Sequence, residues 1–195
     1  MSTFLTYKVY NVFTMKSKEL VLVALFATLT SIGAFIAIPF VPVPITLQTF
    51  FVMLSGMLLG KRLGALSQLF YLFLGAIGLP VFSGGGSGIG FMAGPTGGYL
   101  IGFVLGAYAV GLVTEKRNDI RSYVVGLILC TIVIDVCGVL QLMNFTGMSF
   151  VHALEVGVLP FLVGDILKSA LAISITRKVK LANVLHLSHT VYTKS

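Results

Sequence analysis

The chain has 195 residues, of which 57% are hydrophobic and only 10% are charged, with a formal net charge of +7. Soluble domains carry about 25% charged residues, so this chain has too few charges to cover a water-facing surface, and its mean hydropathy of +1.03 indicates lipid as the solvent. A net positive charge is also typical of nucleic-acid-binding proteins, but the basic residues here lie in short clusters between apolar stretches, which argues against nucleic acid as a partner.

Six apolar segments follow one another along the chain, separated by polar or by proline- and glycine-rich breaks. A membrane-spanning helix needs about 20 apolar residues, with a range near 17–25. The second segment is shorter than this, and the fourth is rich in glycine. The segments are 20–38, 47–60, 63–79, 97–114, 123–142 and 156–175.

The distribution of lysine and arginine gives the orientation of these segments. Twelve of the 13 basic residues lie before the first segment, after the last, or in the breaks at 61–62 and 115–122. The alternate breaks at 39–46, 80–96 and 143–155 hold none. Because positive residues stay on the cytoplasmic side, the sequence predicts an all-α membrane protein of six transmembrane helices with both termini cytoplasmic.

The same pattern divides the chain into three parts. Residues 1–19 form a cytoplasmic N-terminal segment, 20–178 the transmembrane domain, and 179–195 a cytoplasmic tail. The apolar run at 20–38 is too long for the core of a signal peptide, which has roughly 7–15 residues, so we expect it to stay in place as the first span. Either Met1 or Met15 is the starting residue.

Small residues recur along the first span at steps of three and four. Such a stripe lets another helix approach closely. The spacing leaves open whether that neighbour is internal or another protein. The residues are Ala24, Ala27, Thr28 and Ser31.

Two of the uncharged outer breaks are unusually apolar. The break at 39–46 contains three prolines, each of which lacks a backbone donor, so it is not helical throughout. The glycine-rich break at 80–96 is expected to fold back over the helices, because its large apolar side chains favour burial; a merely flexible hairpin is the alternative. These side chains are Phe82, Ile89, Phe91 and Met92.

Three ionisable residues lie within the spans, namely Asp135, Asp165 and Lys168. Each costs about 2.5–3.5 kcal/mol at a helix centre, so such residues usually have partners and a function. Asp165 and Lys168 are three apart and share a helix face; they form either an internal neutral pair or a polar spot on a cavity wall. At 1.5 Å rise per residue, Asp135 and Asp165 lie at similar heights beyond the midplane, so one pocket beneath the outer loops is predicted if the last two helices face each other. Asp135 as a lone residue stays an alternative.

Several other kinds of site are absent from the sequence. There is no G-x-x-x-x-G-K-[ST] phosphate loop, so the chain does not hydrolyse ATP by that route. His152 and Glu155 are three apart near the last span, but no further ligand lies nearby in the sequence, so no metal site is predicted.

Seven short sequence blocks follow one another in order between about residues 40 and 168. They are VPITLQ at 43–48, LLG at 58–60, LGA at 63–65, GAIGLPVF at 75–82, GPTGGYL at 94–100, GF at 102–103 and GDILK at 164–168. In this combination of blocks the chain resembles the BioY family, the biotin-binding S components of energy-coupling factor (ECF) transporters.

The resemblance implies a biotin site near the outer face, capped by the first and third outer loops. Asp165 is suited to accept hydrogen bonds from the ureido N–H groups and Lys168 to face the carboxylate or the ureido carbonyl, but which end of biotin each residue contacts is left open. Asp135 joins these two by its depth rather than by the resemblance. Candidates for the remaining contacts are Gln48, Ser83, Gly85, Ser87 and Tyr99.

The resemblance also implies partners. A membrane T component would dock on the stripe of the first helix, and two ATPase subunits would hydrolyse ATP, so the chain itself is expected to be non-catalytic, to hold no cofactor or metal, and to reside in a prokaryotic plasma membrane. Three alternatives remain: an S component for another vitamin, a channel, and a small intramembrane enzyme that uses Asp135, Asp165 or His152.

Overall fold

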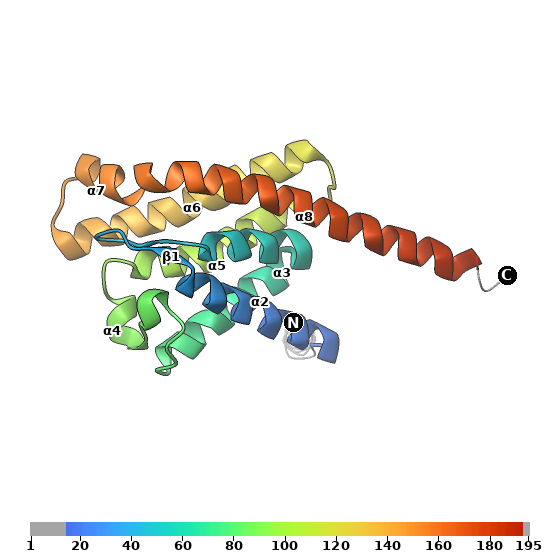
Figure 1. The fold of residues 1–195 in the computed structure, drawn as a ribbon, viewed down its shortest axis with the longest axis horizontal. Coiled ribbons are helices and arrows are strands. Elements are labelled where there is room, and N and C mark those ends of the chain that lie inside the picture. Colours follow the sequence, from blue (N-terminus) through green and yellow to red (C-terminus); the bar gives the residue numbers. More distant parts are fainter. Residues whose placement is uncertain (1–14, 193–195) are drawn as a thin grey trace, which may run out of the picture.

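The computed structural model describes residues 15–192, with side chains described as far as Ala182. Nearly all of this part is helical, and a short β-hairpin and one 3₁₀ turn lie between the helices (Figure 1). The elements are α2 Ser17–Phe35, β1 Ala37–Ile38, β2 Ile45–Thr46, α3 Gln48–Ala76, η1 Ser83–Gly85, α4 Gly88–Met92, α5 Gly97–Thr114, α6 Ile120–Thr146, α7 Phe150–Gly157 and α8 Leu159–Tyr192.

Five helices of the described part are long and apolar enough to cross a membrane, namely α2, α3, α5, α6 and α8. This finding confirms the prediction of an all-α membrane protein. It does not settle the number of crossings, because it takes α3 as one helix where the sequence predicts two segments, 47–60 and 63–79.

Helix α3 folds back on itself at Gly60, whose φ of 79° and ψ of 176° belong to a region that only glycine adopts readily. The two halves then run side by side: Gln48 donates a hydrogen bond to the hydroxyl of Tyr71, and Gln68 Nε2 donates to Ser55 Oγ at 3.2 Å. In a straight helix, residues 23 positions apart are separated by roughly 35 Å. The break between the second and third predicted segments is therefore real.

Helix α5 occupies the centre of the bundle, and α8 lies at its edge. In α5, 67% of the span is buried, against 22% in α8. Gly56 of α3 lies against Ala107 and Val110 of α5 with no room for a Cβ. On the other side of α5, Gly102 lies 2.8 Å, measured from an ideal Cβ, from Ile134 Cα of α6. Glycines thus let α3 and α6 approach α5 from both sides.

Apart from Lys168, the basic residues of the described part belong to segments at one end of the bundle, to the right in Figure 1, where the described chain also begins and ends. Lys61, in the turn of α3, lies 3.6 Å from Glu115 at the end of α5. Lys180 Nζ donates to Asn118 Oδ1 at 3.0 Å. Here Asp119 caps α6 by accepting from the Ser122 amide and hydroxyl, which lowers the pKa of the Asp119 carboxyl.

Helix α8 continues through residue 192, so the segment from residue 179 onward begins as helix rather than as a separate tail. In Figure 1 it projects beyond the rest of the bundle. Lys8 and Lys194 lie outside the described residues. Residues 1–14 do too, so the structure does not test whether Met1 or Met15 is the starting residue.

The opposite end carries the two apolar loops. Around the prolines, Ala37 pairs with Thr46 and Ile38 with Ile45 in an antiparallel hairpin, which the sequence analysis did not predict. In the glycine-rich loop, Phe82 is fully buried, with ring centroids 5.5 Å from Tyr71 and 5.2 Å from Phe91. The predicted folding back is confirmed there, whereas the expected burial of Ile89 is wrong, since that side chain is 73% exposed.

Candidate functional site

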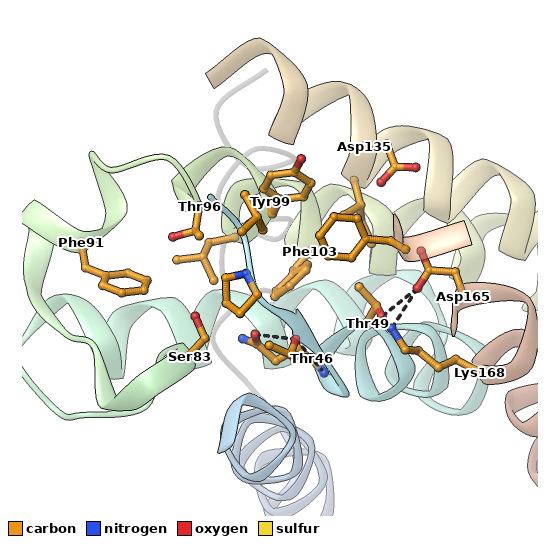
Figure 2. Close-up of a pocket in the computed structure, with 16 residues that line it drawn as sticks. Thr46, Thr49, Ser83, Phe91, Thr96, Tyr99, Phe103, Asp135, Asp165 and Lys168 are labelled. Atoms are coloured by element: carbon orange, nitrogen blue, oxygen red, sulfur yellow. Dashed lines mark hydrogen bonds and ion pairs between the residues drawn. The ribbon is translucent and has the colours of Figure 1, made fainter. Parts of the chain in front are cut away.

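A cavity lies inside the bundle beneath these two loops, enclosing about 520 Å³ with its opening included. Its floor and sides come from α3, α5, α6 and α8, and its cover from the β-hairpin and the glycine-rich loop. It is lined by Val43, Pro44, Thr46, Gln48, Thr49, Ser83, Phe91, Thr96, Tyr99, Leu100, Phe103, Ile134, Asp135, Phe161, Asp165 and Lys168 (Figure 2).

One end of the cavity holds a buried ion pair. Lys168 Nζ donates to Asp165 Oδ1 at 3.0 Å and to Thr49 Oγ1 at 2.9 Å, and Thr49 Oγ1 in turn lies 3.3 Å from Asp165 Oδ1 (Figure 2). Asp165 and Lys168 are 7% and 8% exposed. They share a face of α8, and the fold brings the first turn of α3 to them.

This ion pair keeps hydrogen-bonding capacity for a ligand. An ammonium group has three N–H donors and a carboxylate has two accepting oxygens. Lys168 uses two donors on Asp165 and Thr49, and Asp165 Oδ2 accepts from no described residue. A free donor and a free acceptor therefore lie side by side at the cavity wall, so the pair is both an internal ion pair and a polar spot on the wall.

Asp135 reaches the same cavity from α6, as the depth count predicts (Figure 2). Its side chain is half-buried, and its carboxylate makes no hydrogen bond or ion pair with another described residue. The fold thus brings together all three ionisable residues of the spans.

A hydrogen-bonded chain links the two covering loops. Thr46 Oγ1 of the hairpin donates to Gln48 Oε1 at 2.9 Å, and Gln48 Nε2 donates to the Tyr71 hydroxyl. Tyr71 then donates to the Val81 carbonyl at 3.1 Å, at the start of the glycine-rich loop. Both the oxygen and the nitrogen of the buried Gln48 amide are therefore engaged in holding the hairpin and the loop in position.

The remaining predicted contact residues lie in different places. Ser83 lines the cavity, but Gly85 and Ser87 do not, and Ser87 is exposed. Tyr99 lines it with its ring, because its hydroxyl donates to the Gly157 carbonyl at 2.8 Å. The loop at 143–155 contributes no lining residue, so the expected cover by the third outer loop is wrong: the first and second loops cover the cavity.

Several lining residues were not identified from the sequence. Thr49 is the most important of them, and it follows Gln48 directly in the chain, yet nothing in its spacing marks it as a partner of residues 116 and 119 positions away. The aromatic walls give no sequence signal either, because five of the six apolar segments contain Phe. They are Phe91, Phe103 and Phe161.

The small-residue stripe of α2 is divided between two environments. Ala27 is fully buried, whereas Thr28 is exposed and Ala24 and Ser31 lie between these extremes.

Within the described residues no group of three or more His, Cys, Asp or Glu side chains is placed to hold a metal ion. His152 and Glu155 form an exposed pair, with 3.4 Å between Nδ1 and Oε2.

Comparisons with known proteins agree on one family. The model of the BioY family matches residues 7–183. A protein named "Probable biotin transporter BioY" from Pyrococcus horikoshii is 47% identical over 166 residues, which cover 85% of this chain and 98% of the relative. "Biotin transporter BioY" from Thermotoga maritima is 41% identical over 163 residues, covering 84% and 96%. Among solved structures, the S-component for biotin from an ECF-type ABC transporter matches with a TM-score of 0.75 at 30% identity, covering 86% of this chain and 95% of that one.

Proposed function

Because the chain belongs to the BioY family, we propose that it is the substrate-binding (S) subunit of an ECF-type transporter and that it binds biotin in the cavity beneath its outer loops. The observation that carries this proposal is the adjacent free donor and free acceptor of Lys168 and Asp165 in a cavity whose walls also present the rings of Phe91, Phe103 and Phe161. The chain is a transport subunit and not an enzyme.

The chemistry of the cavity favours one orientation of biotin. The ureido ring presents two N–H donors beside a carbonyl acceptor, which complements Asp165 Oδ2 and the free donor of Lys168. The valerate carboxylate has acceptors only, and next to Asp165 it would meet a like charge. The ureido ring therefore binds at the ion pair, and the carboxylate points towards the Ser83 and Thr96 hydroxyls beneath the loops.

The aromatic side chains provide the apolar part of the site. Phe103 is 4% exposed, Leu100 is 3% exposed, and Phe161 lies with its ring 6.3 Å from that of Tyr99. The thioether ring and the valerate methylenes pack between these walls, where burial contributes about 25 cal/mol per Å² of apolar surface.

The orientation in the membrane follows from the position of the basic end. In this proposal each half of α3 crosses separately, so the chain crosses six times, with both termini and the basic end in the cytoplasm. The cavity then opens towards the outside of a prokaryotic plasma membrane. A T component and two ATPase subunits supply the energy, and the exposed part of the α2 stripe, centred on Thr28, is the docking face for the T component.

Titration calorimetry of the detergent-purified chain with biotin, riboflavin and thiamin tests the proposal. We expect tight binding of biotin alone, and a loss of at least tenfold in affinity for Asp165→Asn and for Lys168→Gln. Glu155→Gln and Lys61→Gln, which remove the same charges from positions that do not line the cavity, are the matched controls and keep wild-type affinity. Preference for another vitamin, or chemical conversion of biotin, would contradict the proposal.

Biotin methyl ester tests the orientation. With the ureido ring at the ion pair, Lys168→Gln weakens binding of biotin and of the ester by the same factor. A larger loss for biotin than for the ester would place the carboxylate on Lys168 instead.

A further inference from the structure

Helices α6 and α8 leave an open seam between them on the outside of the bundle. The seam is an apolar groove of about 1100 Å³ with its open side included. Several of its side chains are exposed, among them Ile128 at 55%, Ile132 at 52% and Ile166 at 68%. In a bilayer these side chains face lipid, so the groove has the character of a binding site for an acyl chain.

The basic end of the same seam holds a cleft of different chemistry. It is lined by Arg177, Lys178 and Lys180 of α8 with Asn118 and Tyr123, and by no carboxylate among the described residues. Lys180 bonds to Asn118 and lies 5.3 Å from the centre of the Tyr123 ring. Arg177 and Lys178 are exposed and make no hydrogen bond or ion pair with another described residue, so the cleft has two cationic groups available for an anion.

The cleft and the groove are adjacent along α6 and α8. Tyr123 and Ser174 line the cleft, and their chain neighbours Val124 and Ile173 line the groove. From Arg177 to Asp165, which lines the groove, is twelve residues, or roughly 18 Å along the helix. One leaflet makes up about 15 Å of a hydrocarbon core about 30 Å thick, so this length of helix crosses one leaflet.

We propose that the α6–α8 seam binds one phospholipid with an anionic headgroup from the leaflet at the basic end of the bundle. The headgroup phosphate lies on Arg177 and Lys178, since guanidinium and ammonium groups bind phosphate oxygens by charge-assisted hydrogen bonds. One acyl chain follows the groove between α6 and α8. The cleft supplies the charge and the groove supplies the apolar length, and an anionic phospholipid has both in this order.

Two residues of the groove connect this lipid to the substrate cavity. Asp135 and Asp165 line both the groove and the cavity. The acyl chain therefore passes against the wall that separates the ion pair from the bilayer, where it excludes water from that side.

Native mass spectrometry of the detergent-purified full chain tests the proposal. The probes are phosphatidylglycerol and phosphatidylcholine with identical acyl chains. We expect one phosphatidylglycerol to bind at least tenfold more tightly than phosphatidylcholine, and the double variant Arg177→Gln/Lys178→Gln to lose this preference. The matched control, Lys16→Gln/Lys18→Gln, removes two exposed charges from α2 at the same end and keeps it.

A second pair of variants tests the groove separately from the cleft. Ala170→Trp fills the groove and lowers retention of either lipid, whereas Leu171→Trp, one position along and outside the groove, does not. Competition by inorganic phosphate at millimolar concentration would indicate a free-phosphate site and overturn the proposal. Equal binding of the two lipids would overturn it too, and so would lipid retention that Ala170→Trp leaves unchanged. A groove that is filled only in the assembled transporter would assign the groove to a partner helix and would also overturn the proposal.

Discussion

Replacing both members of the buried ion pair should restore stability without restoring biotin binding. Lys168→Met leaves Asp165 as a carboxylate that has lost its ammonium partner at 3.0 Å, and Asp165→Asn leaves Lys168 without its anion. The side chains of both residues are 10% exposed. Removing one partner of a buried pair costs roughly 3–5 kcal/mol, and we expect about 3 kcal/mol because the cavity admits water to one side.

The double variant Asp165→Asn/Lys168→Met carries no charge at either of the two positions, and its amide still has Thr49 as a partner. A neutral pair of similar volume is often as stable as the ion pair that it replaces. We therefore expect the free energy of unfolding of the double variant to be within about 1 kcal/mol of wild type, which gives a coupling energy well above that of independent sites.

Biotin binding should behave differently from stability in the same three variants. Each loses at least one charge-assisted hydrogen bond to the ureido ring, worth about 2 kcal/mol, which corresponds to roughly a 30-fold rise in Kd. Equilibrium unfolding in mixed micelles gives the stability, and titration calorimetry gives the affinity. Additive destabilisation in the double variant would refute the coupling, and wild-type affinity in it would refute the assignment of the site.

Three further predictions concern residues that position the site. Thr49→Val should raise the Kd for biotin about tenfold, measured by calorimetry, because the ion pair loses its neutral partner; unchanged affinity would mean that water replaces the hydroxyl at no cost. Gly60→Ala should destabilise the fold by roughly 1–3 kcal/mol in unfolding assays, because its φ is positive, whereas Gly90→Ala, with open space around it, should be neutral. Phe82→Ala should cost about 3–5 kcal/mol as a fully buried ring and increase proteolysis of the glycine-rich loop; an intact loop would show that this ring does not hold it.

The class of the protein and the height of its charged residues followed from the sequence because both depend on local properties. Apolar length identifies a spanning helix whatever it packs against, and basic residues mark the same end of the bundle whichever helices are neighbours. The spacing of Asp165 and Lys168 placed them on one helix face, and the rise per residue placed Asp135 at their level.

Contacts between segments far apart in the chain were decided only by the tertiary structure. Thr49 joins the ion pair across 116 and 119 residues, and no periodicity records that distance. The Tyr99 hydroxyl turns to Gly157, 58 residues away, and so leaves only its ring to the cavity. The open seam between α6 and α8 is likewise a property of packing. Most residues of both spans are apolar, and only the relative positions of the helices determine which apolar faces meet each other and which remain for lipid.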